Sequence, residues 1–363
     1  MPLIFDAHED IAYNMLAFGR DYTRSVHETR QIEATTETPL QNGTCLLGLP
    51  EHRQGNIALT FATLFAPPIR KQAGPSETYV YKDAEEAHRL YRNQLDLYRR
   101  LADEKPEDFR LVRNAREMKE HLSEWQMPEE TRPQPLGLIP LMEGADAIRT
   151  PDELEEWWAL GLRVISLAWA GTRYSGGTGD PGPLTDAGRA LLEGMAEFGF
   201  ILDISHMDEA ATLEALDRYE GKLLASHSNA KALLPQSRSN RHISDRVIHG
   251  IIERDGVIGV IPYNLFLKYG WRLSDGRENI SLDHLVAQID HVCQIAGDAD
   301  HVGIGSDFDG GFGVESTPKE IDTIADLQKI APLLAERGYT EENIDAIFAK
   351  NFIRYLEKSL PSS

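Results

Sequence analysis

Short apolar runs alternate with longer amphipathic segments along most of the chain. About eight of these runs predict buried strands, at residues 3–5, 56–65, 136–142, 163–168, 200–204, 222–225, 256–261 and 301–304. Between them, apolar residues at helical spacing predict helices, at residues 82–103, 151–159, 185–198, 281–296, 320–336 and 341–357. Strands and helices that alternate in this way predict an α/β fold of the (β/α)₈ TIM-barrel type.

Other segments are less regular. Residues 11–55 show no clear periodicity, and a smaller strand–helix unit is expected at 109–112 and from about residue 114 onward. Four segments rich in glycine, proline or polar residues predict loops or connections, at residues 35–39, 48–55, 128–135 and 171–183.

Length and composition suit one large domain. The chain has 363 residues, of which 41% are hydrophobic, enough for a single barrel or for two smaller domains. No polar stretch is long enough to act as a linker, so we expect a single barrel domain over residues 1–363.

Charge and cysteine content narrow the class of protein. A net charge of −21 argues against nucleic acid or an anionic membrane as a partner. The two cysteines do not form a disulfide framework or a cysteine-type zinc site. The sequence starts directly in the first apolar run and contains no stretch of about 18 apolar residues. We therefore expect a cytoplasmic enzyme with a small-molecule substrate.

The informative polar residues come directly after apolar runs. In a barrel of this type the active site lies where the strands end. Any one of these residues is more simply explained as a cap of the following helix, but several on one rim are harder to dismiss. The residues at these strand ends are His8, Asp10, Glu143, His206, His227 and Asp307.

Three imidazoles and three carboxylates on one rim suit a site for two zinc ions with open positions. Asp6, His8 and Asp10 alternate along the first strand, so they share one face. We expect Glu9 to point the other way, and Asp6 to lie deeper and to orient a ligand.

These residues lie in segments that resemble the membrane dipeptidase (renal dipeptidase) family, within the amidohydrolase-like metal-dependent hydrolases. The resemblance runs from residue 3 to about 357 and is weakest over 20–130. The segments that carry it are Asp6–Asp10, Met142–Gly144, Arg163–Leu167, Pro183–Gly188, Leu202–His206, Ser226–Ala230, Gly303–Gly310 and Lys350–Arg354.

The resemblance implies a zinc-dependent dipeptidase that cleaves small dipeptides, including those with a D-residue at the carboxyl side. His8 and Asp10 would hold one zinc ion, His206 and His227 the other, and Glu143 would bridge both. A hydroxide between the ions would be the nucleophile. Asp307 would move the proton, with Asp309 as the competing candidate.

On the substrate side the resemblance implies that Arg241 binds the terminal carboxylate. Tyr263 and Asn264 either line the pocket or pack in its wall. Trp169 stands where renal-type enzymes carry a histidine, and its indole can donate a hydrogen bond but carries no charge.

Trp169 leaves other substrates open, namely another amide, a lactone or an ester. A pathway protein on the same fold without peptidase turnover is a further alternative. The resemblance also leaves a homodimer open.

Overall fold

The structure, a computed structural model, describes residues 1–74, 77–127 and 134–363. In the described chain, eight parallel strands follow one another in the order β10-β11-β1-β2-β4-β5-β8-β9. A parallel bridge between Ala225 and Ile258 joins the two outer members, so the sheet closes into a barrel. The strands of the barrel are β1 (Ile4–Glu9), β2 (Ile57–Leu64), β4 (Leu136–Glu143), β5 (Val164–Ser166), β8 (Ile201–Asp203), β9 (Lys222–Leu224), β10 (Ile258–Val260) and β11 (Val302–Ile304). The predicted TIM barrel is confirmed.

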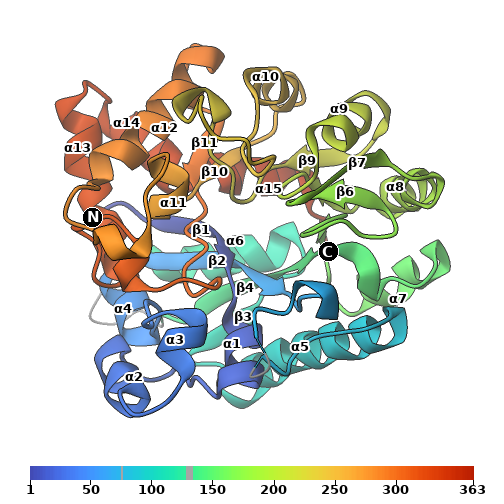
Figure 1. Cartoon of the computed structure of the whole chain (residues 1–363), viewed down its shortest axis with the longest axis horizontal. Coiled ribbons are helices and arrows are strands. Elements are labelled where there is room, and N and C mark those ends of the chain that lie inside the picture. Colours follow the sequence, from blue (N-terminus) through green and yellow to red (C-terminus); the bar gives the residue numbers. More distant parts are fainter. Residues whose placement is uncertain (75–76, 128–133) are drawn as a thin grey trace.

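Helices surround the barrel, with α5 along one side and α12 to α14 on another (Figure 1). The α-helices are α1 (Ile11–Phe18), α2 (Val26–Glu33), α3 (Thr38–Asn42), α4 (Leu49–Gln54), α5 (Ala84–Glu104), α6 (Ala115–Trp125), α7 (Leu154–Ala159), α8 (Asp186–Phe198), α9 (Glu209–Arg218), α10 (Asp245–Glu253), α11 (Asn264–Leu267), α12 (Leu282–Ala296), α13 (Ile330–Glu336), α14 (Glu341–Asp345) and α15 (Asn351–Ser359). Within the described chain, no helix combines the length and apolar character that crossing a bilayer requires.

The loop expected at residues 48–55 is wrong, because α4 occupies most of it, and α3 begins at the end of the loop expected at 35–39. Both helices carry a proline in their first turn, where the missing N–H costs nothing. The expected Gly-rich loop contains a small antiparallel hairpin, β6 (Ser175–Gly177) and β7 (Asp180–Leu184). β3 (Phe109–Leu111) pairs with β4 outside the ring. The predicted connection at 128–135 lies largely outside the described residues.

Helix α5 secures the carboxyl ends of two neighbouring strands. Asp83 caps its first turn by accepting a hydrogen bond from the Glu86 N–H. The Tyr91 hydroxyl donates to the Glu143 carbonyl at 2.7 Å, and the Tyr98 hydroxyl donates to the Thr63 carbonyl at 2.8 Å. The helix therefore fixes the backbone at the rim of the barrel.

A buried ion network holds the segment after β11 against the N-terminal helices. Arg20 is 3% exposed, and its Nη1 lies 3.0 Å from Asp309 Oδ2 while its Nε lies 2.8 Å from Glu33 Oε1. The Tyr22 hydroxyl and the Leu46 N–H also donate to the Asp309 carboxylate. One guanidinium thus compensates two buried carboxylates.

We predict that Arg20→Met lowers the free energy of unfolding by about 3–5 kcal/mol, because it leaves two carboxylates buried without their cation. Denaturant unfolding measures the change. Arg24→Met is the matched control: Arg24 has a 47% exposed side chain and lies 3.8 Å from Asp21, so its loss should change stability by less than about 0.5 kcal/mol. Equal effects of the two substitutions would contradict this account of the network.

Candidate metal centre and active site

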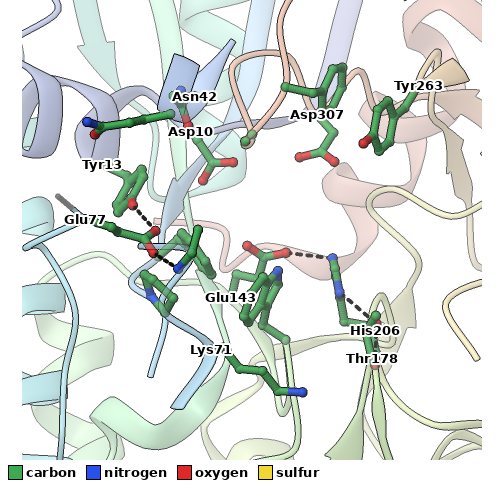
Figure 2. A pocket seen from close by; sticks show the side chains of 18 of the residues that line it. Asp10, Tyr13, Asn42, Lys71, Glu77, Glu143, Thr178, His206, Tyr263 and Asp307 are labelled. Carbon is green, nitrogen blue, oxygen red and sulfur yellow. Dashed lines mark hydrogen bonds and ion pairs between the residues drawn. The ribbon is translucent and has the colours of Figure 1, made fainter. Parts of the chain in front are cut away.

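Six predicted side chains meet at the carboxyl ends of five barrel strands. β1 supplies two of them, and β4, β8, β9 and β11 supply one each. Figure 2 shows Asp10, Glu143, His206 and Asp307 pointing into one cavity. The structure therefore brings together the residues predicted from their places at strand ends, namely His8, Asp10, Glu143, His206, His227 and Asp307.

Glu143 lies at the centre of the three imidazoles. Its Oε1 is 3.1 Å from His206 Nε2, 3.3 Å from His227 Nε2 and 3.8 Å from His8 Nε2. The two Nε2 atoms of His206 and His227 face each other at 3.0 Å. One carboxylate oxygen thus lies within reach of nitrogens from β1, β8 and β9.

Acidic groups crowd the other side of His8. Its Nε2 lies 3.9 Å from both Asp10 Oδ2 and Asp307 Oδ1. Two overlapping groups have a geometry that could hold a metal ion: His8 with Glu143 and His227, and His8 with Asp10 and Asp307. Asp307 therefore lies near enough to act as a ligand as well as a base.

The backbone adopts an uncommon conformation at two of these residues. His206 has φ 67° and Asp307 has φ 56°, in the left-handed region that residues other than glycine seldom occupy. Gly310 lets the aspartates approach each other, because a Cβ there would lie 2.2 Å from Asp307 Oδ1 and 2.8 Å from Asp10 Oδ2. The local backbone is thus shaped around the position of the carboxylates.

Outer hydrogen bonds orient the imidazoles. Ser226 Oγ donates to Asp203 Oδ2 at 2.6 Å and lies 2.7 Å from His227 Nδ1. Thr178, in the turn of the β6–β7 hairpin, has its Oγ1 3.0 Å from His206 Nδ1. Each hydroxyl can accept the Nδ1 proton, which leaves the Nε2 lone pair directed at the centre.

The sequence analysis missed Thr178, because the hairpin that carries it was read as a loop. It also missed Ser226, although Ser226 directly precedes His227. A hydroxyl residue next to a candidate ligand histidine is a signal that could have identified it.

Burial favours neutral imidazoles. Together with the charge of Arg241, it lowers the pKa of His8 to about 3. It also lowers the pKa of His206 and His227 well below the usual value, with the neighbouring charges of Arg241 and His8 acting in the same direction. A neutral imidazole is the form that binds a metal ion.

Burial has the opposite effect on the carboxyl groups. Together with the negative charges of Asp309 and Glu9, it raises the pKa of Asp10 to about 7. Burial and the charge of Asp10 also raise the pKa of Glu143 and Asp307. These groups need a cation nearby in order to stay ionised at neutral pH.

The residues fit a metal centre. Among the described residues, His8 Nε2 and Asp10 Oδ1 are buried without a hydrogen-bond partner. The facing nitrogens of His206 and His227 have no proton between them when both Nδ1 atoms carry one. Neutral nitrogens and carboxylate oxygens are the donor types that divalent metals take.

The site opens into a cavity of about 580 Å³. Arg241, Trp169 and Tyr263 line it, as predicted. The Arg241 guanidinium is held by the His227 carbonyl at 2.7 Å and by Ser228 Oγ at 3.3 Å. Asn264 is not in the cavity lining; it is buried and donates to the Thr317 carbonyl at 2.9 Å, so it packs in the wall.

Three neighbouring acidic residues are not part of the cavity lining. Asp6 accepts hydrogen bonds from the Ser306 N–H and hydroxyl, and so supports the segment after β11. Glu9 lies 2.8 Å from His52 Nε2, on the side opposite to His8 as expected from strand alternation. Asp309 belongs to the Arg20 network and does not line the cavity, so it does not compete with Asp307 for contact with substrate.

Comparison with known proteins agrees with this geometry. The family described as membrane dipeptidase, peptidase family M19, matches residues 1–360. The chain belongs to this family. The family is described as a dipeptidase family and a solved M19 relative as a metallopeptidase, and the chain is accordingly a metallo-dipeptidase.

Individual relatives cover nearly all of the chain. An uncharacterised dipeptidase of Schizosaccharomyces pombe is 27% identical over 97% of this chain and 80% of its own length. A crystal structure of dipeptidase AC, an M19 metallopeptidase, is 25% identical, covers 100% of this chain and 99% of its own, and has a TM-score of 0.77. A metallopeptidase from Rhodobacter sphaeroides, described as liganded with a phosphinate mimic of L-Ala-D-Ala, shares the fold at 24% identity and a TM-score of 0.78, over 99% of both chains.

We predict that Thr178→Val weakens metal binding by this dipeptidase about 10- to 100-fold, because His206 loses the hydroxyl that orients its ring. Competition with a chelator of known affinity measures the change. Thr178→Ser keeps the hydroxyl and should retain most of the affinity. Similar losses in both variants would show that the methyl group, and not the hydroxyl, matters.

Proposed function

We propose that this metallo-dipeptidase works with two zinc ions and hydrolyses small dipeptides, including those with a D-residue at the carboxyl side. The observation that supports two ions is that Glu143 Oε1 lies within 3.8 Å of the Nε2 atoms of His8, His206 and His227, while His8 also belongs to a second group of possible ligands with Asp10 and Asp307. Nitrogen and oxygen donors without cysteine suit zinc in a catalytic site. His8 and Asp10 would hold one ion, His206 and His227 the other, and Glu143 would bridge them.

When bound, the metal ions supply a water of lowered pKa as the nucleophile and polarise the scissile carbonyl. Side chains of the protein transfer the proton and position the substrate. Asp307, at the cavity edge of the same cluster, accepts the proton of the attacking water and passes it to the leaving amine nitrogen. Its raised pKa suits a group that must hold a proton between the two steps.

Arg241 is proposed to bind the free carboxylate of the dipeptide. Its guanidinium is buried and lines the cavity, and within the described residues its Nε lacks a hydrogen-bond partner. Tyr263 stacks on Phe312 with ring centroids 4.2 Å apart, which fixes its ring in the wall beside Arg241. Trp169 packs edge-on against Phe65 at 5.1 Å and forms an apolar wall in place of a histidine.

We further propose a cytoplasmic location for the enzyme. Cys45 and Cys293 are free and buried, which suits a reducing compartment. Cell fractionation with an antibody against the chain tests this, and recovery in the membrane or secreted fraction would contradict it. A homodimer stays a prediction.

We predict that removing metal with a chelator abolishes dipeptide hydrolysis and that two equivalents of zinc restore it. A panel of L,L- and L,D-dipeptides and metal analysis measure both effects.

Asp307→Asn should lower kcat about 10²- to 10⁴-fold with most of the metal retained, because the proton carrier is lost. Turnover that survives both metal removal and this substitution would come from a contaminant, and loss of metal in the variant would make Asp307 chiefly a ligand.

We predict that Arg241→Met raises KM for free dipeptides about 10- to 100-fold, because a charged hydrogen-bond partner of the carboxylate is removed. The matched substrate is the same dipeptide with a C-terminal amide, which has no carboxylate to lose. Its kcat/KM should be similar in the wild type and the variant. A loss of the same size for both substrates would assign Arg241 to the metal centre instead of the carboxylate.

A further inference from the structure

The cavity has two chemically different sides. Figure 2 shows Tyr263 and His206 on one side, and Tyr13 and Glu77 on the other, with Glu143 between them. Arg241 belongs to the first side, because its guanidinium lies 5.5 Å from the Phe266 ring, which packs against Tyr263. A dipeptide with its carboxylate at Arg241 and its peptide bond at the centre therefore extends its N-terminal residue toward Glu77.

Glu77 is a carboxylate held in place by neutral donors. The Tyr13 hydroxyl donates to Oε1 at 3.0 Å, and the Ala73 N–H donates to Oε2 at 2.6 Å. Across the described residues, Glu77 is in no ion pair within 4.0 Å, so no positive side chain cancels its charge. Each oxygen keeps a lone pair that can accept a further hydrogen bond.

Aromatic rings surround this carboxylate. Tyr13 is 4% exposed and packs edge-on against Phe65 at 5.3 Å and Tyr79 at 5.8 Å. Phe65 in turn contacts Trp169, which reaches the metal side of the cavity. Ring faces and a carboxylate together favour a cationic group with an alkyl stem.

Lys71, in the same part of the wall, points to an anionic ligand instead. It lines the cavity, but its Nζ is 2.9 Å from Asp180 Oδ1, on the β6–β7 hairpin, a carboxylate that it shares with Arg70 at 3.4 Å. Lys71 therefore has an ion-pair partner within the protein, whereas Glu77 has none among the described residues. The balance of these contacts favours a cationic side chain.

We propose that Glu77 makes the enzyme selective for dipeptides whose N-terminal residue has a cationic side chain of the arginine or lysine type. This inference rests on the proposed function, because it uses the dipeptide orientation set by Arg241. The metal centre acts on the peptide bond and does not select this side chain, so Glu77 adds a preference for one class of dipeptides. Glu77 acts as a specificity residue at the far side of the cavity from Arg241.

The test compares Arg-Ala with citrulline-Ala on the zinc-loaded enzyme, because citrulline keeps the shape of arginine without its charge. We expect kcat/KM to be about tenfold higher for Arg-Ala than for citrulline-Ala, because one charge-assisted hydrogen bond in a partly buried site contributes about that factor. Glu77→Gln keeps the shape of the side chain: its oxygen can accept from the Ala73 N–H while its amide donates to the Tyr13 hydroxyl. It should bring the ratio close to one. Glu220→Gln, the same charge change at an exposed position, should leave the ratio unchanged.

Three outcomes would overturn the inference while leaving dipeptidase activity intact. They are equal rates for Arg-Ala and citrulline-Ala in the wild type, a ratio that Glu77→Gln does not lower, and a preference for Glu-Ala, which would assign the side-chain subsite to Lys71. Absence of hydrolysis for every dipeptide would instead overturn the proposed function, and with it the orientation on which this inference depends.

Discussion

The structure depends on one constraint: buried nitrogen and oxygen atoms with free lone pairs converge at its centre, with no proton between them. The Nε2 atoms of His206 and His227 face each other at 3.0 Å, and Glu143 brings one oxygen within 3.3 Å of both. Such a cluster is costly to bury unless a cation neutralises it. Metal binding must therefore compete with protons for these groups. Burial and the charges of Asp309 and Glu9 raise the pKa of Asp10, so protons compete with a metal ion more strongly there than at an exposed aspartate.

Asp307 and Asp309 show how one short segment serves both the site and the fold. Both have a positive φ, and the turn of the chain between them sends their side chains to opposite sides. Asp309 meets Arg20 at 3.0 Å and is fully buried, whereas Asp307 faces the cavity. The carboxylate that faces the cavity, Asp307, thus lies two residues from a carboxylate that is paired with an arginine, Asp309. A strained segment of this kind persists only where its surroundings fix it.

The sequence predicted those parts that local pattern controls. Apolar runs predicted the barrel strands, and the polar residues that follow them predicted the cluster at the rim, because a parallel barrel brings all its strand ends to one rim. It did not predict α3 and α4, whose short helices depend on packing more than on periodicity. It also gave no sign that Thr178 would meet His206 or that Glu77 would face the cavity, since both contacts join segments distant in sequence. For Asn264 the sequence left pocket lining and wall packing open, because a place after a strand does not decide which way a side chain points, and the structure shows wall packing.

The β6–β7 hairpin links the metal side of the cavity to its substrate side. Its turn carries Thr178 to His206, and the next residue, Gly179, donates its N–H to Asn240 Oδ1 at 3.0 Å, directly before Arg241 in the chain. Asp180, one residue further, holds Lys71 in the opposite wall. Three consecutive residues thus contact the His206 imidazole, the residue before Arg241 and Lys71 in the far wall. A displacement of this hairpin would alter metal geometry and substrate contacts together, which is why substitutions there should be judged by metal affinity and KM in parallel.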